Sequence, residues 1–153
     1  MRRPLAFLYR LQRIFWRLLR PRTRGVKVML FNPAGDVLLV RHTYGDTGLF
    51  LLPGGGVRPF EAPARAAARE IREELGCGVD ALVLVSIHAS SHEGKRDTVH
   101  LYRARAVGDI RIDGVEIAEA RFFALAALPD AASPATRRRL AELGGERMAD
   151  GRW

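Results

Sequence analysis

Three glutamates, Glu70, Glu73 and Glu74, lie close together near the C-terminal end of a predicted helix. This position is electrostatically unfavourable, because anions stabilise the N-terminal end of a helix and like charges three or four residues apart repel each other. A positive partner outside the helix is therefore expected. A divalent cation is the simplest candidate, since Mg²⁺ is commonly bound by a few carboxylates while it keeps water and phosphate ligands.

The helix that carries these glutamates is predicted to run from about Ala62 to Leu75, directly after a glycine loop. At about 100° per residue, its apolar side chains fall within ~60° of one another, which predicts a face that packs on a sheet. The three glutamates project on the opposite side, around Ala66, whose small side chain leaves room above them. The predicted packing face comprises Ala64, Ala67, Ala68, Ile71 and Leu75.

Glu61 lies outside this acidic arc but at the start of the helix, where the preceding loop can turn it toward the same pocket. A second interpretation needs no metal. Arg65, Arg69 and Arg72 are close enough in sequence to form ion pairs with the glutamates on an exposed helix. The spacing of the charged residues alone leaves both interpretations open.

Length and composition are typical of one globular domain. The 153 residues suffice for a single well-packed core and are too few for two ordinary domains. No uncharged apolar run approaches the ~20 residues that a membrane-spanning helix requires. The single cysteine, Cys77, excludes an internal disulfide and a cysteine-based zinc cluster, and it suits a reducing compartment. We therefore expect a cytoplasmic protein.

The formal net charge of +8 is concentrated near the N-terminus. Residues 1–30 hold nine basic side chains and no acidic one, whereas the rest of the chain holds 16 basic and 17 acidic side chains. The basicity therefore belongs to an N-terminal appendage, and nucleic acid is not an expected partner of the domain.

The appendage is predicted to form a basic amphipathic helix over residues 4–20. Three interpretations remain open: packing on its own domain or on a second copy, lying in an anionic membrane surface, and nucleic-acid contact or a targeting peptide. The expected partners of residues 4–20 are therefore an anionic membrane or a homodimer. Arg3, Arg10, Arg13, Arg17 and Arg20 form the basic stripe, and Leu8, Leu11, Phe15, Leu18 and Leu19 form the apolar side.

The other segments predict a mixed sheet covered by helices on its faces. Ser133-Pro134 has the chemistry of a helix start, and Gly144-Gly145 ends that helix. The predicted organisation is a helix and linker at 1–24, one domain at 25–145 and a tail at 146–153. Strands are expected at 26–31, 37–41, 49–52, 81–88, 97–107 and 121–125, and the first two are expected to form a hairpin around a turn at 32–36.

Residues 55–77 resemble the Nudix box. Gly55, Glu61, Arg69-Glu70-Ile71, Glu73-Glu74 and Gly76 match that motif position by position. The one departure is Cys77 in the last aliphatic position, which a small and usually buried thiol can fill. The resemblance continues less sharply along 25–143, through Leu52-Pro53-Gly54 before the box and Arg121-Phe122-Phe123 and Leu128-Pro129 after it.

The resemblance implies a Nudix-type α/β/α sandwich with a mixed sheet, in addition to the N-terminal helix. It implies a hydrolase, dependent on Mg²⁺ or Mn²⁺, that cleaves the pyrophosphate bond of a nucleoside diphosphate linked to another group, such as a nucleotide sugar or an ADP-ribose-like compound. A pyrophosphate needs metal ions that neutralise its charge and activate the attacking water. No Walker-type Gly-Lys-Ser/Thr follows the glycines, so a nucleotide-driven motor or kinase is not supported.

By the same resemblance, Glu70, Glu73 and Glu74 are metal ligands. Glu61 is an auxiliary or water-mediated ligand, and the carbonyl of Gly55 is a further one. The resemblance also assigns catalytic roles to Glu70, Glu73 and Arg69, with Arg69 as the residue that pairs with the glutamates and orients them. The general base is either Glu70 or a glutamate outside the box, for which Glu93, Glu116 and Glu119 are the candidates.

Residues outside the box are candidates for binding substrate. Arg41 could meet a phosphate, and Tyr44 and Phe60 could stack on a base, whereas Phe50 alternates like a core residue. His88 and His92 span a strand end and a loop, so we interpret them as loop or pocket-rim histidines, and their spacing does not indicate a zinc site.

Substrate identity stays open. His92-Glu93 and Gly94 stand where some relatives carry a proline or tyrosine associated with ADP-ribose or dinucleoside polyphosphates. The alternative to an enzyme is a non-catalytic, nucleotide-binding regulatory Nudix module, tethered to a membrane or partner by its N-terminal helix. The intact set of glutamates favours the enzyme.

Overall fold

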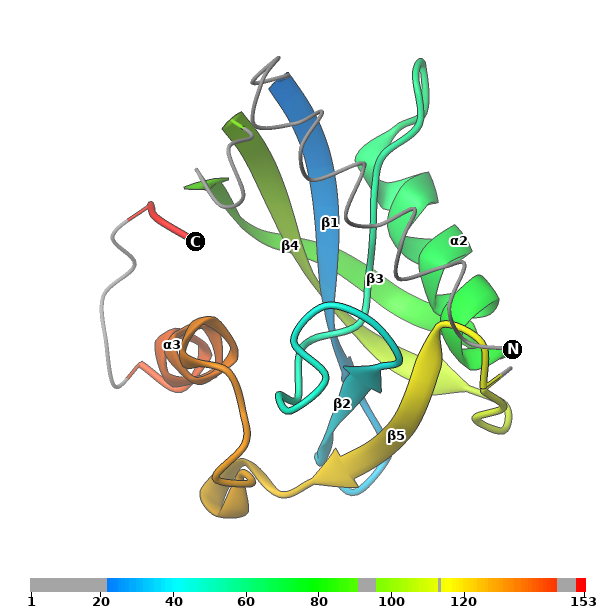
Figure 1. Ribbon diagram of the computed structural model, residues 1–153, viewed down its shortest axis with the longest axis vertical. Coiled ribbons are helices and arrows are strands. Elements are labelled where there is room, and N and C mark those ends of the chain that lie inside the picture. The colour runs from blue at the N-terminus through cyan, green and yellow to red at the C-terminus, as the bar shows by residue number, and fades with distance from the viewer. Residues whose placement is uncertain (1–21, 91–95, 113, 146–150) are drawn as a thin grey trace.

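The computed structural model describes residues 22–90, 96–112, 114–145 and 151–153. The helix predicted for 4–20 lies outside these ranges, as do His92, Glu93 and Gly94. The described chain forms a mixed sheet with one helix against each face (Figure 1). Its strands are β1 (Arg22–Phe31), β2 (Val37–His42), β3 (Gly78–Ser90), β4 (Arg96–Val107) and β5 (Ile117–Phe123), and its helices are α2 (Pro63–Leu75), η2 (Leu125–Ala127) and α3 (Pro134–Leu143).

The sheet has the strand order β3-β4-β1-β2-β5. β1 pairs with β4 in parallel, and the other neighbours are antiparallel. The predicted β1–β2 hairpin is present, and Asn32 accepts a hydrogen bond of 2.9 Å from the Asp36 amide through Oδ1 in its turn. In the described part of the chain, no helix is long and apolar enough to cross a membrane.

Two apolar clusters fill the two sides of the sheet, which confirms the predicted sandwich. The cluster on the α2 side includes Val28, Leu30, Ile71, Leu75 and Cys77, all buried. The cluster on the α3 side includes Met29, Leu39, Phe50, Leu52 and Leu140. Alternate β1 residues therefore point into different clusters, as the period of two in a strand requires.

Several boundaries differ from the predictions. β1 begins at Arg22 because its first residues pair with β4, so residues predicted as linker are strand. The predicted strand at 49–52 is reduced to isolated bridges at Phe50 and Leu51, since it pairs with Ala132 and Val40 one residue at a time. β5 is displaced toward Ile117 and ends at Phe123. A second helix confirms the prediction for 134–143, with Ser133 Oγ accepting from the Thr136 amide at 3.1 Å.

The predicted packing face of α2 was partly wrong. Ala64 is exposed, whereas Ala66 and the charged Glu74 are buried with Ala67, Ile71 and Leu75. The buried face of the helix is therefore turned toward the glutamates: it includes Glu74 and borders Glu70, whereas Glu73 stays exposed. The helical projection assumed that charged side chains face solvent. It therefore missed the burial of Glu74, whose carboxylate accepts its compensating hydrogen bond from a distant loop.

The interpretation of His88 as a loop or pocket-rim residue was also wrong. His88 lies within β3 and is 1% exposed. Its Nδ1 lies 2.5 Å from Nη1 of Arg139, a fully buried residue of α3. The contact crosses from strand to helix, so sequence spacing gave no sign of it.

Candidate active site

The glycine loop is fixed against β1 by its backbone. The Val28 amide donates to the Pro53 oxygen, and the Val26 amide donates to the Gly55 oxygen, both at 2.9 Å. Gly54 has φ 131°, and a Cβ at this position would lie 2.3 Å from the Val26 oxygen. Only glycine fits there, so the close approach of loop and strand depends on this residue.

Two glutamates of α2 face this loop. The Gly54 amide donates to Oε2 of Glu74 at 2.9 Å, and Glu74 is only 5% exposed. A Cβ on Gly55 would lie 2.6 Å from Oε2 of Glu70. The missing side chain at Gly55 therefore leaves space that the Glu70 carboxylate occupies, while Glu74 is held by the Gly54 amide.

Arg69 connects the remaining acidic groups. Its Nε and Nη2 donate to the two oxygens of Glu61 at 2.8 and 2.9 Å. Its Nη1 donates to Glu70 at 2.6 Å and to Glu73 at 3.0 Å, and Nη2 also reaches the Gly56 oxygen at 2.9 Å. Such a forked, charge-assisted network gives geometric specificity. Arg69 thus links Glu61 at the start of the helix, the Gly56 carbonyl of the loop, and the glutamates Glu70 and Glu73 through hydrogen bonds.

Local electrostatics differ among the glutamates. Burial raises the pKa of Glu74 to about 7, although Lys27 and the Gly54 hydrogen bond lower it. Burial also raises the pKa of Glu70. The hydrogen bonds from Arg69 lower the pKa of Glu61 to about 2. The buried Glu74 and the partly buried Glu70 are thus the carboxylates that an added cation would stabilise most.

Lys27 is a residue of this site that the sequence reasoning missed. Its Nζ donates to the oxygens of Leu52 and Gly54 at 3.0 and 3.1 Å. Burial lowers the pKa of Lys27, while the charges of Glu74, Glu70 and Asp97 raise it. Lys27 lies on a strand whose residues alternate into the core, and this position could have indicated a partly buried lysine. It was instead counted among the basic residues of the N-terminal appendage.

The sequence of this chain matches the NUDIX domain family over residues 21–143. The chain belongs to the Nudix hydrolase family. It is accordingly a pyrophosphohydrolase, and α2 is its Nudix helix.

Individual relatives agree with this assignment. A Bacillus subtilis (strain 168) protein named as a candidate 8-oxo-dGTP diphosphatase is 33% identical over 108 residues, which cover 70% of either chain. A Nudix hydrolase of Pseudomonas aeruginosa is 34% identical over 103 residues, covering 65% of this chain and 61% of that one. The crystal structure of a MutT Nudix hydrolase from Burkholderia pseudomallei is similar with a TM-score of 0.71 and 28% identity, covering 80% of this chain and 98% of that one.

Nudix hydrolases generally use divalent metal ions, and the donor chemistry here suits one. Carboxylate and carbonyl oxygens are the ligands that Mg²⁺ prefers. Glu70 and Glu74 approach the glycine loop from the helix, and Gly55 presents no side chain to either. Among the described residues, however, no three acidic, histidine or cysteine side chains converge as a ready-made metal cluster. Arg69 holds one oxygen of Glu70 and both of Glu61.

The candidate general bases outside the Nudix box have different surroundings. Glu119 forms ion pairs with Arg41 and, at 3.6 Å, with Arg121. The negative charge of Glu116 acts on the box, where it raises the pKa values of Glu70 and Glu74. Glu93 lies outside the described residues.

The candidate substrate-binding residues Arg41, Tyr44 and Phe60 have different surroundings. Arg41 pairs with Glu119, and its guanidinium lies 5.4 Å from the ring centroid of Phe50. Phe50 is buried, as expected. Tyr44 lies in the loop after β2, with its ring centroid 5.4 Å from that of His42. Phe60 is fully exposed at φ 62°, just before α2.

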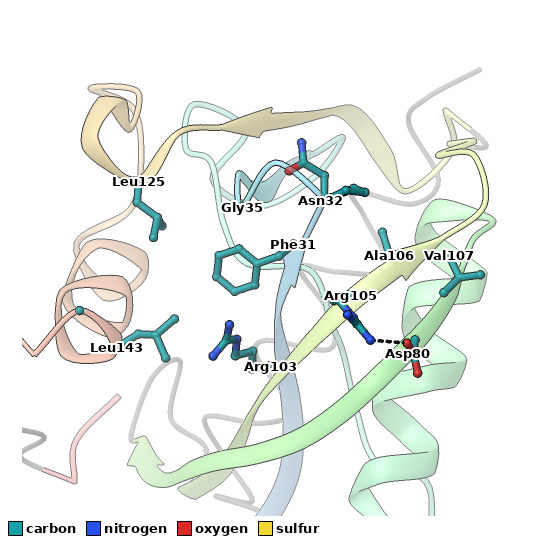
Figure 2. A pocket seen from close by; sticks show the side chains of 12 residues that line it. Phe31, Asn32, Gly35, Asp80, Arg103, Arg105, Ala106, Val107, Leu125 and Leu143 are labelled. Atoms are coloured by element: carbon teal, nitrogen blue, oxygen red, sulfur yellow. Dashed lines mark hydrogen bonds and ion pairs between the residues drawn. The ribbon is translucent and has the colours of Figure 1, made fainter.

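A cavity of about 750 Å³ lies elsewhere, at the ends of β1 and β4. Figure 2 shows Phe31, Leu125 and Leu143 around it, with Arg105 reaching Asp80. The Arg103 guanidinium lies 5.5 Å from the Phe31 ring centroid. None of the Nudix-box glutamates lines this cavity, so it is separate from the candidate active site.

Proposed function

We propose that this Nudix hydrolase cleaves the pyrophosphate bond of a nucleoside diphosphate linked to another group, with Mg²⁺ or Mn²⁺ as cofactor. The observation that carries the proposal is the buried carboxylate of Glu74, held by the Gly54 amide beside Glu70. Burial of carboxylates is costly unless a positive group compensates it. Lys27 and the Gly54 amide offset part of that cost. A divalent cation supplies further positive charge, and the substrate's phosphates complete its ligands.

In this proposal Glu74, Glu70 and Glu73 hold the metal, assisted by Glu61 and the Gly55 carbonyl. Glu74 is the principal ligand because it is the most buried of the four glutamates, whereas the Glu73 side chain is 49% exposed and pairs with Arg58. When bound, the cation would neutralise phosphate charge and lower the pKa of the attacking water.

The chain's own residues then position the reaction. Glu70 is the first candidate to accept the proton of the attacking water, since it is partly buried at the loop and burial raises its pKa. Arg69 keeps Glu70, Glu73 and Glu61 in fixed relative positions through its hydrogen bonds. Glu116 is the second candidate base because its charge acts on the same carboxylates, whereas the ion pairs of Glu119 make that residue less suitable.

Arg41, Tyr44 and Phe60 are the proposed substrate contacts. Arg41 would release Glu119 to meet a phosphate, and the two aromatic rings would stack on a base. The products would be a nucleoside monophosphate and a phosphorylated partner. The name of the Bacillus subtilis relative adds 8-oxo-dGTP to the compounds worth testing.

A substrate panel tests this function. Nucleotide sugars, ADP-ribose, dinucleoside polyphosphates, (d)NTPs and 8-oxo-dGTP would be incubated with the full chain and Mg²⁺ or Mn²⁺, and monophosphate release measured. We expect turnover of at least one compound that requires the metal and is lost in Glu74→Gln. Nucleotide binding without turnover across the whole panel would instead favour the regulatory module.

Cytoplasmic location and contact of residues 4–20 with an anionic membrane or a second copy remain part of this proposal. Their support is compositional: the arginine stripe and apolar side of that segment. The proposed domain limits, 1–24, 25–145 and 146–153, rest on the sequence pattern, and the start of β1 at Arg22 moves the first limit to residue 21.

A further inference from the structure

β1 holds four consecutive carbonyl oxygens of the glycine loop. The backbone amides of Val28 and Val26 donate to the second and fourth of these oxygens, which belong to Pro53 and Gly55. The Lys27 ammonium donates to the first and third, which belong to Leu52 and Gly54. Because successive carbonyls of an extended chain point in opposite directions, the strand backbone can reach only alternate ones. The Lys27 side chain supplies the donors for the other two.

The same loop segment, residues 52–55, also contacts the carboxylates of Glu74 and Glu70. The Gly54 amide binds Glu74, and the Gly55 Cα faces Glu70 so closely that a Cβ would clash. The peptide unit is planar, so a fixed Gly54 carbonyl also fixes the plane that leads into Gly55. The Gly54 amide lies in the peptide unit between the two units that Lys27 holds, so loss of the Lys27 contacts would loosen the groups that locate both glutamates.

Lys27 also adds opposite charge to the cluster. Its ammonium acts on Glu74 and Glu70, and both carboxylates act on it in return. A lysine that served only as a charge would compete with an incoming cation, so its removal would tighten metal binding. A lysine that positions the loop would have the opposite effect, because its removal would loosen the site.

We propose that Lys27 is a positioning residue of the metal site, which holds the Leu52–Gly54 carbonyls and thereby fixes the loop backbone against which Glu74 and Glu70 are arranged. This inference rests on the proposed metal-binding role of these glutamates. It assigns a function to a side chain on β1, outside the Nudix box.

Lys27→Met tests the inference, since it keeps an apolar stem and removes both donors and charge. Binding of Mn²⁺ alone would be measured by calorimetry, and amide exchange at Gly54 by NMR, in the full chain. We expect Mn²⁺ affinity to fall about tenfold, as for other residues that orient metal ligands. Gly54 exchange should rise by about the same factor, because its amide is then held less firmly. Lys27→Arg, which keeps charge and donors, should recover much of both.

Arg24→Met is the matched control. It removes a cation from the same strand, but the Arg24 side chain is exposed, so Mn²⁺ affinity and Gly54 exchange should stay as in the wild type. Equal or tighter Mn²⁺ binding by Lys27→Met would overturn the inference, as would weaker binding with unchanged Gly54 exchange.

Two further variants keep the outcomes separable. If Lys27→Met does not fold, Lys27→Ala takes its place, since it also removes both donors and the charge; wild-type affinity and exchange in that variant would overturn the inference. If Glu74→Gln binds Mn²⁺ like the wild type, the proposed metal site itself is wrong. If Glu74→Gln loses Mn²⁺ while Lys27→Met does not, only the role of Lys27 fails.

Discussion

The Gly54 amide and the Glu74 carboxylate, twenty residues apart in the chain, are joined by a hydrogen bond of 2.9 Å. This bond lets a charged side chain of α2 face the interior, because a buried carboxylate needs a donor to replace water. The candidate site therefore lies where the glycine loop contacts α2. Lys27 holds the loop through a hydrogen bond to Gly54, and Arg69 holds the helix glutamates through its bond to Glu70.

Gly54→Ala should destabilise the protein by roughly 2–4 kcal/mol. At φ 131° the new Cβ would lie 2.3 Å from the Val26 oxygen, so loop and strand must separate. Urea unfolding would measure the loss. Gly56→Ala is the control, because a Cβ there meets nothing within 4 Å, and its effect should stay within about 0.5 kcal/mol. Equal stability of the two variants would contradict the close packing of the loop.

Arg69→Lys should lower Mg²⁺-dependent turnover and Mn²⁺ affinity by about ten- to hundredfold although the charge is kept. A lysine cannot reproduce the fork that reaches Glu61, Glu70 and Glu73 together. Steady-state kinetics at varied Mg²⁺ would show the change. Arg72→Lys, an exposed neighbour on the same helix, serves as control and should behave like the wild type. Wild-type kinetics in Arg69→Lys would mean that only the charge matters.

His42 should make stability depend on pH. Burial lowers the pKa of His42 from 6.5 to about 4, and the charge of Lys27 acts in the same direction. Between these values the unfolded chain binds more protons than the folded chain, so the His42 contribution is present above pH 6.5 and is lost as pH falls toward 4. Relative to the wild type, His42→Gln should therefore gain stability on acidification, by at most about 3 kcal/mol. Urea unfolding from pH 7 to 4.5 checks this, and a pH-independent difference between the two proteins would refute it.

Deletion of residues 1–21 should leave Mg²⁺-dependent turnover largely intact, because the described site lies entirely beyond them. The deletion removes six arginines and the apolar side chains of the predicted helix. Binding to anionic vesicles or self-association should weaken, as sedimentation assays would reveal. The cut must stop before Arg22, where β1 begins. Failure of the truncated protein to fold would show that the segment belongs to the core.

Local patterns predicted most of the fold. The β1–β2 turn, the α3 start at Ser133-Pro134 and the α2 end at Gly76 follow from residues whose backbone preferences are strong. The reduced strand near Leu51 was not predictable in the same way, since its pairing with Val40 is decided by the fold as a whole.

The candidate site was predictable in its residues but only partly in its geometry. The Nudix-box resemblance brought Glu61, Arg69, Glu70 and Glu73 together, and the structure places all of them in one hydrogen-bonded network. The inward turn of Glu74 and the contacts of Lys27 were missed. Both depend on backbone groups of the glycine loop, which no side-chain pattern along α2 or β1 reveals.

Glu74→Gln measured with and without Mg²⁺ tests the central claim most directly. The amide keeps the size of the side chain and loses the charge, so the fold should persist while Mg²⁺-dependent turnover falls by at least about a hundredfold. Mg²⁺ should raise the melting temperature of the wild type and leave that of the variant unchanged. Glu73→Gln, at a more exposed position, should lose less activity. Full Mg²⁺-dependent turnover by Glu74→Gln, on every substrate that the wild type cleaves, would contradict the account.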